Sequence, residues 1–115
     1  MAKNTPFSDI TVLDFSRYLP GGYATQVLAD LGATVIKVED TGLGDFMRHD
    51  YPTKGGGISY YITALGRNKK SVSLNLKNEE VVDWFLKMAQ EADIIVESFR
   101  PGVTAKLGID YESIK

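Results

Sequence analysis

One stretch of sequence, ITVLDFSRYLPGGYATQVLADLGATVIKV at residues 10–38, decides the fold. It begins with a nearly continuous apolar run over 10–15, the pattern of a parallel strand buried on both faces. Apolar residues then recur at helical spacing over 23–31, and Gly32 stands where a left-handed residue commonly ends a helix. A second β-rich run follows at 34–38. Strand, helix, glycine and strand within about thirty residues predict a β-α-β unit.

The helix of this unit is expected to begin only after Pro20-Gly21-Gly22, which interrupts the strand pattern. Its buried face is predicted to carry Tyr23, Val27 and Leu31, because these residues lie on one helical stripe. The two glycines are more simply explained by tight packing than by anion binding.

Further elements follow the same alternation of strands and helices. We expect a long loop over 40–57, a short helix over 59–65, a strand over 71–76, a helix capped by Asn78, and a strand over 94–96. A short helix should end before Gly108, and another opens at 111–114. Helical crossovers imply parallel neighbours. The prediction is an α/β fold with a Rossmann-like, open, mostly parallel sheet and flanking helices, and it reads as an incomplete part of a larger domain.

Composition excludes several classes of function. A hydrophobic fraction of 43% supports a packed core, and a net charge of −2 does not favour nucleic acid as a partner. The chain has no cysteine, which excludes disulfides and thiolate chemistry, and it lacks the spacing of zinc or EF-hand sites. No apolar run approaches the roughly 20 residues of a membrane span. We therefore expect no metal, no membrane partner and a cytoplasmic location.

Ligands of open α/β sheets bind beyond the carboxyl ends of the strands. The residues expected there are Ser16 to Gly22, Glu39 to Gly44, Lys77-Asn78 and Glu97 to Gly102. In the last of these segments, Phe99 and Arg100 could stack on a base and neutralise a phosphate, or could instead serve the core and a surface ion pair.

Other polar residues have simpler explanations. The basic run over 67–70 is more typical of a solvated surface than of a phosphate site. Asp14 lies inside a strand run and is interpreted as structural, whereas Glu39 and Asp45 are catalytic candidates by position alone. His49 lies in a polar loop. No nucleophile–base pair is evident, so no catalytic residue is assigned.

Five blocks of sequence, in order, resemble the start of class III CoA-transferases, the CaiB/BaiF family. They are VLDFSR (12–17), TQVLADLGATVIKVE (25–39), GLGD (42–45) with Arg48, NKKSVSLNLK (68–77), and ADIIVESFRPGV (92–103) with Leu107-Gly108. The resemblance covers nearly the whole chain. It implies that residues 1–115 are the N-terminal part of the large CoA-binding domain of a longer enzyme that forms an interlocked homodimer.

The resemblance also implies a function and a set of contacts. Such enzymes move CoA between an acyl-CoA and a carboxylic acid through an aspartyl-CoA thioester. The aspartate would lie beyond Lys115, so this segment alone is expected to be inactive, with CoA as substrate rather than as a tightly bound cofactor. Carried over by position, the CoA-contacting residues are Leu74, Asn75, Lys77, Ser98, Phe99, Arg100 and Lys106.

Departures from the family pattern leave alternatives open. Asp40 and Leu19 stand where formyl-CoA transferase-like members have arginine and glutamine, and Ser98 stands where asparagine is common. Phe99-Arg100 is similar to the racemase branch of the fold. A racemase or epimerase acting on an acyl-CoA, and a non-catalytic nucleotide- or CoA-binding module, are therefore the competing interpretations.

Overall fold

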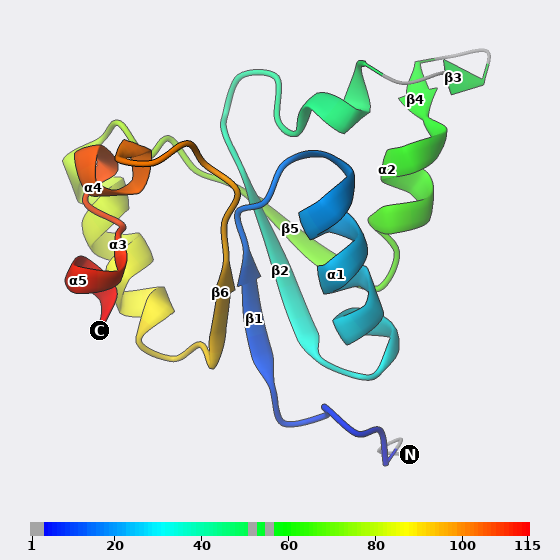
Figure 1. Ribbon diagram of the computed structural model, residues 1–115, viewed down its shortest axis with the longest axis horizontal. Coiled ribbons are helices and arrows are strands. Elements are labelled where there is room, and N and C mark those ends of the chain that lie inside the picture. Colours follow the sequence, from blue (N-terminus) through cyan, green and yellow to red (C-terminus); the bar gives the residue numbers. More distant parts are fainter. Residues whose placement is uncertain (1–3, 51–52, 55–56) are drawn as a thin grey trace.

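The centre of the molecule is a parallel four-stranded sheet (Figure 1). The structure is a computed structural model that describes residues 4–50, 53–54 and 57–115. Its strands are β1 (Thr11–Asp14), β2 (Thr34–Glu39), β5 (Lys69–Ser73) and β6 (Ile94–Val96). They lie in the order β5-β2-β1-β6, which is the order of the first four strands of the doubly wound α/β fold. The prediction of an open, Rossmann-like parallel sheet is confirmed.

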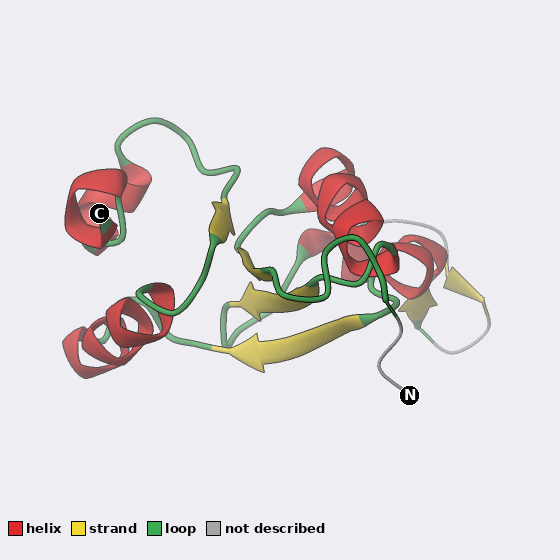
Figure 2. Cartoon of the chain, turned by 90° about the horizontal axis from the view of Figure 1, so that it is seen from below, coloured by secondary structure: helices red, strands yellow, loops and turns green. Residues whose placement is uncertain are grey.

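Helices cover both faces of this sheet (Figures 1 and 2). α1 (Tyr18–Asp30) connects β1 to β2, and α3 (Glu79–Ala89) connects β5 to β6. Consecutive residues of β1 join different cores: Val12 packs with the residues of α1, whereas Leu13 packs with Phe85 of α3. The continuous apolar run of β1 therefore reflects burial on both sides, as predicted.

The segment between β2 and β5 is more structured than the sequence suggested. It contains a short 3₁₀ helix, a two-stranded antiparallel pair and a helix: η1 (Phe46–Arg48), β3 (Thr53–Lys54), β4 (Ile58–Ser59) and α2 (Tyr60–Leu65). The prediction of a continuous loop over 40–57 is therefore wrong, apart from 51–52 and 55–56, which lie outside the described residues. Met47 of η1 packs on Ile62 and Leu65 of α2 in a small core of its own.

The start of α1 differs from the prediction. The helix begins at Tyr18, so Pro20, Gly21 and Gly22 lie inside it rather than before it. Proline is tolerated in a first helical turn because the N–H that it lacks has no helical acceptor there. Gly21 is required for space, since a Cβ at this position would lie 2.1 Å from the Cβ of Ser16. The interpretation of the glycines as packing residues is confirmed.

The apolar stripe of α1 is exposed rather than buried. Tyr23, Val27 and Leu31 are 59%, 38% and 40% exposed, which contradicts the expected buried face. The buried residues of the helix are smaller or polar instead: Gly22, Thr25, Gln26 and Ala29.

β5 covers Lys69–Ser73 instead of the predicted 71–76. Lys69 can enter the strand because its ammonium has a buried partner, the Oδ2 atom of Asp14 at 3.1 Å. The Lys69 side chain is only 2% exposed, so the basic run over 67–70 is not simply a solvated surface. Polar strand residues of this kind carry no periodic apolar signal, which explains the shifted prediction.

Helix ends follow the capping rules that the sequence predicted. Gly32, with φ +105°, follows α1, and its N–H donates to the carbonyl of Ala29. The side chain of Asn78 caps α3 by accepting from the N–H of Glu80. The last helices are α4 (Val103–Leu107), which ends at Gly108, and α5 (Tyr111–Ile114).

Candidate functional site

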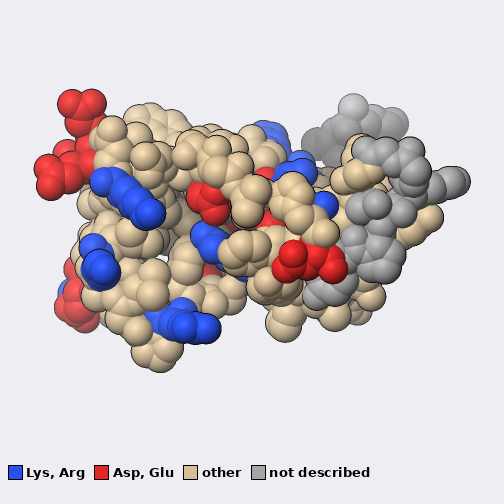
Figure 3. Space-filling view, turned by 90° about the horizontal axis from the view of Figure 1, so that it is seen from above, with Lys and Arg blue, Asp and Glu red and all other residues tan. Residues whose placement is uncertain are grey.

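A cavity of about 880 Å³ lies where β1 and β6 meet at the carboxyl edge of the sheet. The chain runs from β1 toward β2 on one side and reaches β6 on the other, so these neighbouring strands form the topological switch point. Figure 3 looks onto this edge, where several Lys and Arg side chains surround a hollow. The wall of the cavity is formed by Arg17, Tyr18, Pro20, Phe46, Lys77, Ser98, Phe99, Arg100, Val103, Lys106 and Leu107. The fold thus brings together residues far apart in sequence.

Five of the residues proposed from the resemblance line this switch-point cavity: Lys77, Ser98, Phe99, Arg100 and Lys106. They come from the turns after β5 and β6 and from α4. Their ammonium and guanidinium groups give the wall three positive charges, while Phe99 adds an aromatic face. This combination suits a polyanionic ligand that carries a planar ring.

Leu74 and Asn75 do not line this cavity. Leu74 packs against the core on the α3 side, and its N–H donates to the carbonyl of Glu39 over 2.8 Å. The side chain of Asn75 is an acceptor for the N–H of Lys77 at 3.2 Å. In this structure these two residues shape the turn that carries Lys77.

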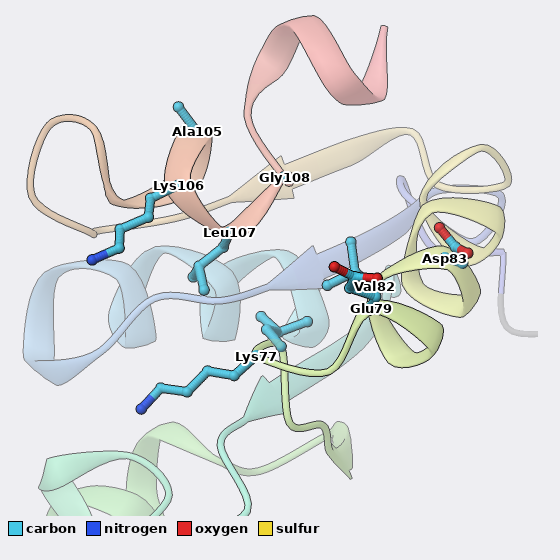
Figure 4. Close-up of a pocket in the computed structure, with 9 residues that line it drawn as sticks. Lys77, Glu79, Val82, Asp83, Ala105, Lys106, Leu107 and Gly108 are labelled. Atoms are coloured by element: carbon cyan, nitrogen blue, oxygen red, sulfur yellow. The ribbon is translucent and has the colours of Figure 1, made fainter.

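A second cavity, of about 770 Å³, adjoins α3 and α4. Figure 4 shows Lys77 and Lys106 extending in the same direction from opposite sides of it, with Leu107 between them. Because these three residues line both cavities, they mark the boundary where the two spaces meet. A ligand long enough to enter both cavities would pass between two ammonium groups.

The loop after β6 is held in place by short hydrogen bonds. Glu97 Oε2 accepts from the N–H of Phe99 at 2.7 Å, and the Oγ atom of Ser98 accepts from the N–H of Arg17 at 2.9 Å. The second bond fastens the β6 loop to the β1 loop. Through this bond Ser98 helps to set the shape of the cavity, a role that the sequence did not indicate.

Arg17 belongs to the segment Ser16 to Gly22 that was expected at this edge, but the sequence analysis gave it no role of its own. Its guanidinium contacts two rings, with Cζ 5.2 Å from the centroid of Phe46 and 5.3 Å from that of Phe99. It also pairs with Asp40, Nη2 to Oδ2, at 3.3 Å. The signal was its position, directly after a buried strand at the switch point, but which strands are neighbours could be known only from the fold.

Two buried ion pairs lie outside the lining of this cavity, one between β1 and β5 and one between β2 and the residue that precedes η1. Asp14 is fully buried and accepts from Ser16, Thr25 and Lys69, so its interpretation as a structural residue is confirmed. Burial lowers the pKa of Lys69, and the carboxylate of Asp14 opposes that shift. In the second pair, the Lys37 Nζ atom lies 2.7 Å from the Asp45 Oδ2 atom.

The other polar residues considered as catalysts also have structural partners. Glu39 receives two hydrogen bonds from Arg48, at 2.8 and 2.7 Å, and one from the N–H of Asp45. Burial alone would raise the pKa of Glu39, but these bonds and the positive charge of Arg48 outweigh it and lower the pKa to about 2. A carboxylate so firmly ionised is a poor proton donor or acceptor near neutral pH. His49 Nε2 lies 2.9 Å from the carbonyl of Leu43.

The described residues were also inspected for metal sites and membrane spans. Within residues 4–50, 53–54 and 57–115, no group of three or more His, Asp and Glu side chains is placed to hold a metal ion. Over the same ranges, no helix has the length and apolar character needed to cross a bilayer.

Fold and site together define an open α/β protein with a cation-rich cavity at its switch point. Residues 7–115 match the family model described as CoA-transferase family III, so the chain belongs to that family. The chain is 42% identical to the acetyl-CoA:oxalate CoA-transferase of Acetobacter aceti, with 95% of this chain and 28% of the relative aligned. It is 41% identical to a formyl-CoA:oxalate CoA-transferase of Escherichia coli, with 97% and 27% aligned.

Solved structures agree with this assignment. A CaiB/BaiF family protein from Brucella suis matches with a TM-score of 0.88 and 36% identity, over 97% of this chain and 30% of that one. A hypothetical protein from Mycobacterium tuberculosis matches with a TM-score of 0.85 and 39% identity, over 96% and 30%. The chain therefore spans less than a third of the length of these relatives.

Proposed function

We propose that the complete protein carrying this chain is a CoA-transferase, which moves CoA from an acyl-CoA to a carboxylic acid. The observation that carries the proposal is the cluster of Lys77, Phe99, Arg100 and Lys106 around the switch-point cavity of a family III chain. Curated relatives with more than 40% identity have CoA-transferase names, which supports this class of reaction.

CoA fits the chemistry of the two cavities. It carries a diphosphate, a ribose 3′-phosphate, an adenine ring and a long pantetheine arm that ends in the thiol. In our proposal its phosphates pair with Lys77, Arg100 and Lys106, and its adenosine lies against Phe99. Ser98, Leu74 and Asn75 complete the contacts or hold the turns in place.

The reaction needs a nucleophile that this chain does not supply. An aspartate carboxylate beyond residue 115 attacks the acyl-CoA carbonyl and releases CoA thiolate, leaving a mixed anhydride. The thiolate attacks the aspartyl carbonyl, which forms an aspartyl-CoA thioester and frees the original acid. The acceptor carboxylate repeats both steps in reverse order and regenerates the aspartate. The segment described here contributes binding energy remote from the reacting bonds.

The test is an assay of the full-length protein with an acyl-CoA and a carboxylic acid, with formation of the new thioester followed by mass spectrometry. Transfer between the two acids is expected. Exchange of the α-hydrogen for deuterium without transfer would identify a racemase instead, and binding of CoA without either reaction would identify a binding module. The isolated 115-residue chain should not transfer CoA, because without the carboxylate nucleophile no anhydride can form.

Assembly and location extend the proposal. The complete protein is proposed to work as an interlocked homodimer, as the resemblance to the CaiB/BaiF family implied, and to be located in the cytoplasm, as the composition suggested. Size-exclusion chromatography with light scattering would test the dimer, and cell fractionation would test the location.

A further inference from the structure

Arg17 connects all three loops that surround the switch-point cavity. It follows β1, its guanidinium pairs with Asp40 after β2, and its backbone N–H donates to Ser98 after β6. The guanidinium carbon also lies over two rings, 5.2 Å from the centroid of Phe46 and 5.3 Å from that of Phe99. Cation–π contacts of this kind hold the group without using any of its hydrogen-bond donors.

Most of those donors have no acceptor in the described part of the chain. A guanidinium can donate several hydrogen bonds, yet the only side-chain bond of Arg17 among those residues is the one to Asp40, at 3.3 Å. The two side chains are 33% and 42% exposed, so the pair is in contact with solvent. An ion pair this exposed contributes little to stability, so a ligand can displace it at small cost.

Arg67 is a surface arginine of the same molecule with more hydrogen-bond partners. Its Nε and Nη2 atoms both donate to Asp30, and its Nη1 atom donates to the carbonyl of Ala64. Arg67 does not line the switch-point cavity. Compared with Arg67, Arg17 contacts two aromatic rings and, among the described residues, has fewer acceptors for its N–H groups at the cavity wall.

We propose that Arg17 binds an anionic oxygen group of the ligand in this cavity, and that Asp40 is the internal partner with which that group competes. The proposal rests on the proposed function, since it takes CoA or a CoA thioester as the ligand. The anionic group is a phosphate of CoA or a carboxylate of its acyl chain. Both groups present paired acceptor oxygens, which match the donor geometry of a guanidinium.

The test measures binding by calorimetry in the full-length protein with the variants Arg17→Gln, Asp40→Asn and the control Arg67→Gln. Arg17→Gln should weaken binding at least about tenfold, the size of a lost charged hydrogen bond. Asp40→Asn should strengthen binding about two- to fivefold, because the competing ion pair is removed. Arg67→Gln should leave binding unchanged. Opposite effects of the first two variants cannot come from a general loss of folding.

Three ligands identify the anionic group. With CoA, 3′-dephospho-CoA and succinyl-CoA, a loss that vanishes for dephospho-CoA assigns the 3′-phosphate, and a loss confined to succinyl-CoA assigns the acyl carboxylate. An equal loss for all three assigns the diphosphate. If the unaltered protein binds CoA but Arg17→Gln binds all three ligands equally well, the inference is wrong. Weaker binding by Asp40→Asn would overturn the role of Asp40. If the unaltered protein does not bind CoA, the proposed function itself fails.

Discussion

Arg100 is the residue at which sequence and structure agree most directly. It follows β6 and lines the cavity, as its place at the carboxyl end of a strand predicted. Arg100→Ala in the full-length enzyme should raise the KM for acyl-CoA roughly tenfold or more, since a charged hydrogen bond contributes about 1.5–3 kcal/mol. The kcat should change little if the contact is equally strong in the ground and transition states. Steady-state kinetics at varied acyl-CoA measure both values, with Arg67→Ala as control. An unchanged KM would make Arg100 an ordinary surface residue.

Glu39 gives the fold a dependence on pH. Its pKa is about 2 in the folded chain against an ordinary 4.5, so below pH 4.5 protons bind the unfolded chain in preference to the folded one. The stability contributed by Glu39 is therefore complete above about pH 4.5 and is lost as the pH falls toward 2. Thermal unfolding of the full-length protein across this range should show a shallower decline in Tm for Glu39→Gln than for the unaltered protein. Parallel curves would contradict the assignment.

At the scale of elements, Asp45 fastens η1 to the beginning of α1. Its Oδ1 atom accepts from the N–H groups of Tyr18 and Met47, and its Oδ2 atom pairs with Lys37, with both side chains at most 4% exposed. Asp45→Asn would leave the Lys37 ammonium buried without a counter-charge, which should destabilise the protein by about 3–5 kcal/mol.

Denaturant unfolding of the full-length protein measures this loss. The matched control is Asp30→Asn, which removes the partner of an exposed arginine and should cost less than about 1 kcal/mol. Lys37→Met combined with Asp45→Asn should recover part of the loss, because no charge then stays buried alone. Equal free energies of unfolding for Asp45→Asn and Asp30→Asn would show that the buried pair contributes no more to stability than the exposed pair.

The elements that could be predicted are those in which local pattern and burial coincide. The runs that contain β1 and β2 are rich in apolar and β-branched residues and are largely buried, and Gly32 and Asn78 obey capping rules that depend only on neighbours in sequence. The start of α1 and the position of β5 depend on distant partners. Lys69 belongs to a strand because it reaches Asp14, a contact that no local pattern encodes.

The candidate site could be predicted only in part for the same reason. Lys77 and Arg100 follow strands and were found from that position, with the family resemblance adding Lys106. Arg17 acquires its place from Phe46 and Asp40, which fold against it from another part of the chain. Which loops meet at the cavity follows from the strand order, which periodicity does not determine.

At the scale of the whole molecule, the exposed side of α1 predicts association. Leu19, Tyr23, Val27 and Leu31 recur at intervals of four residues and are all 38–59% exposed, so they form one apolar stripe on the surface. The isolated 115-residue chain should therefore self-associate through this stripe. Light scattering over a range of concentrations measures the molar mass. Tyr23→Lys with Val27→Glu should shift the chain toward the monomer, whereas a strictly monomeric unaltered chain at high concentration would contradict the prediction.

The hydrogen bond between the Arg17 N–H and the Ser98 Oγ joins residues 81 positions apart. During synthesis, β1, α1 and β2 can leave the ribosome and pair well before β6 exists, because their contacts are nearer in sequence. The cavity has no second wall until the residues after β6 have emerged and β6 has docked beside β1. If the proposed function holds, the ligand can stabilise the chain only after β6 has docked, and it cannot assist the folding of the first half.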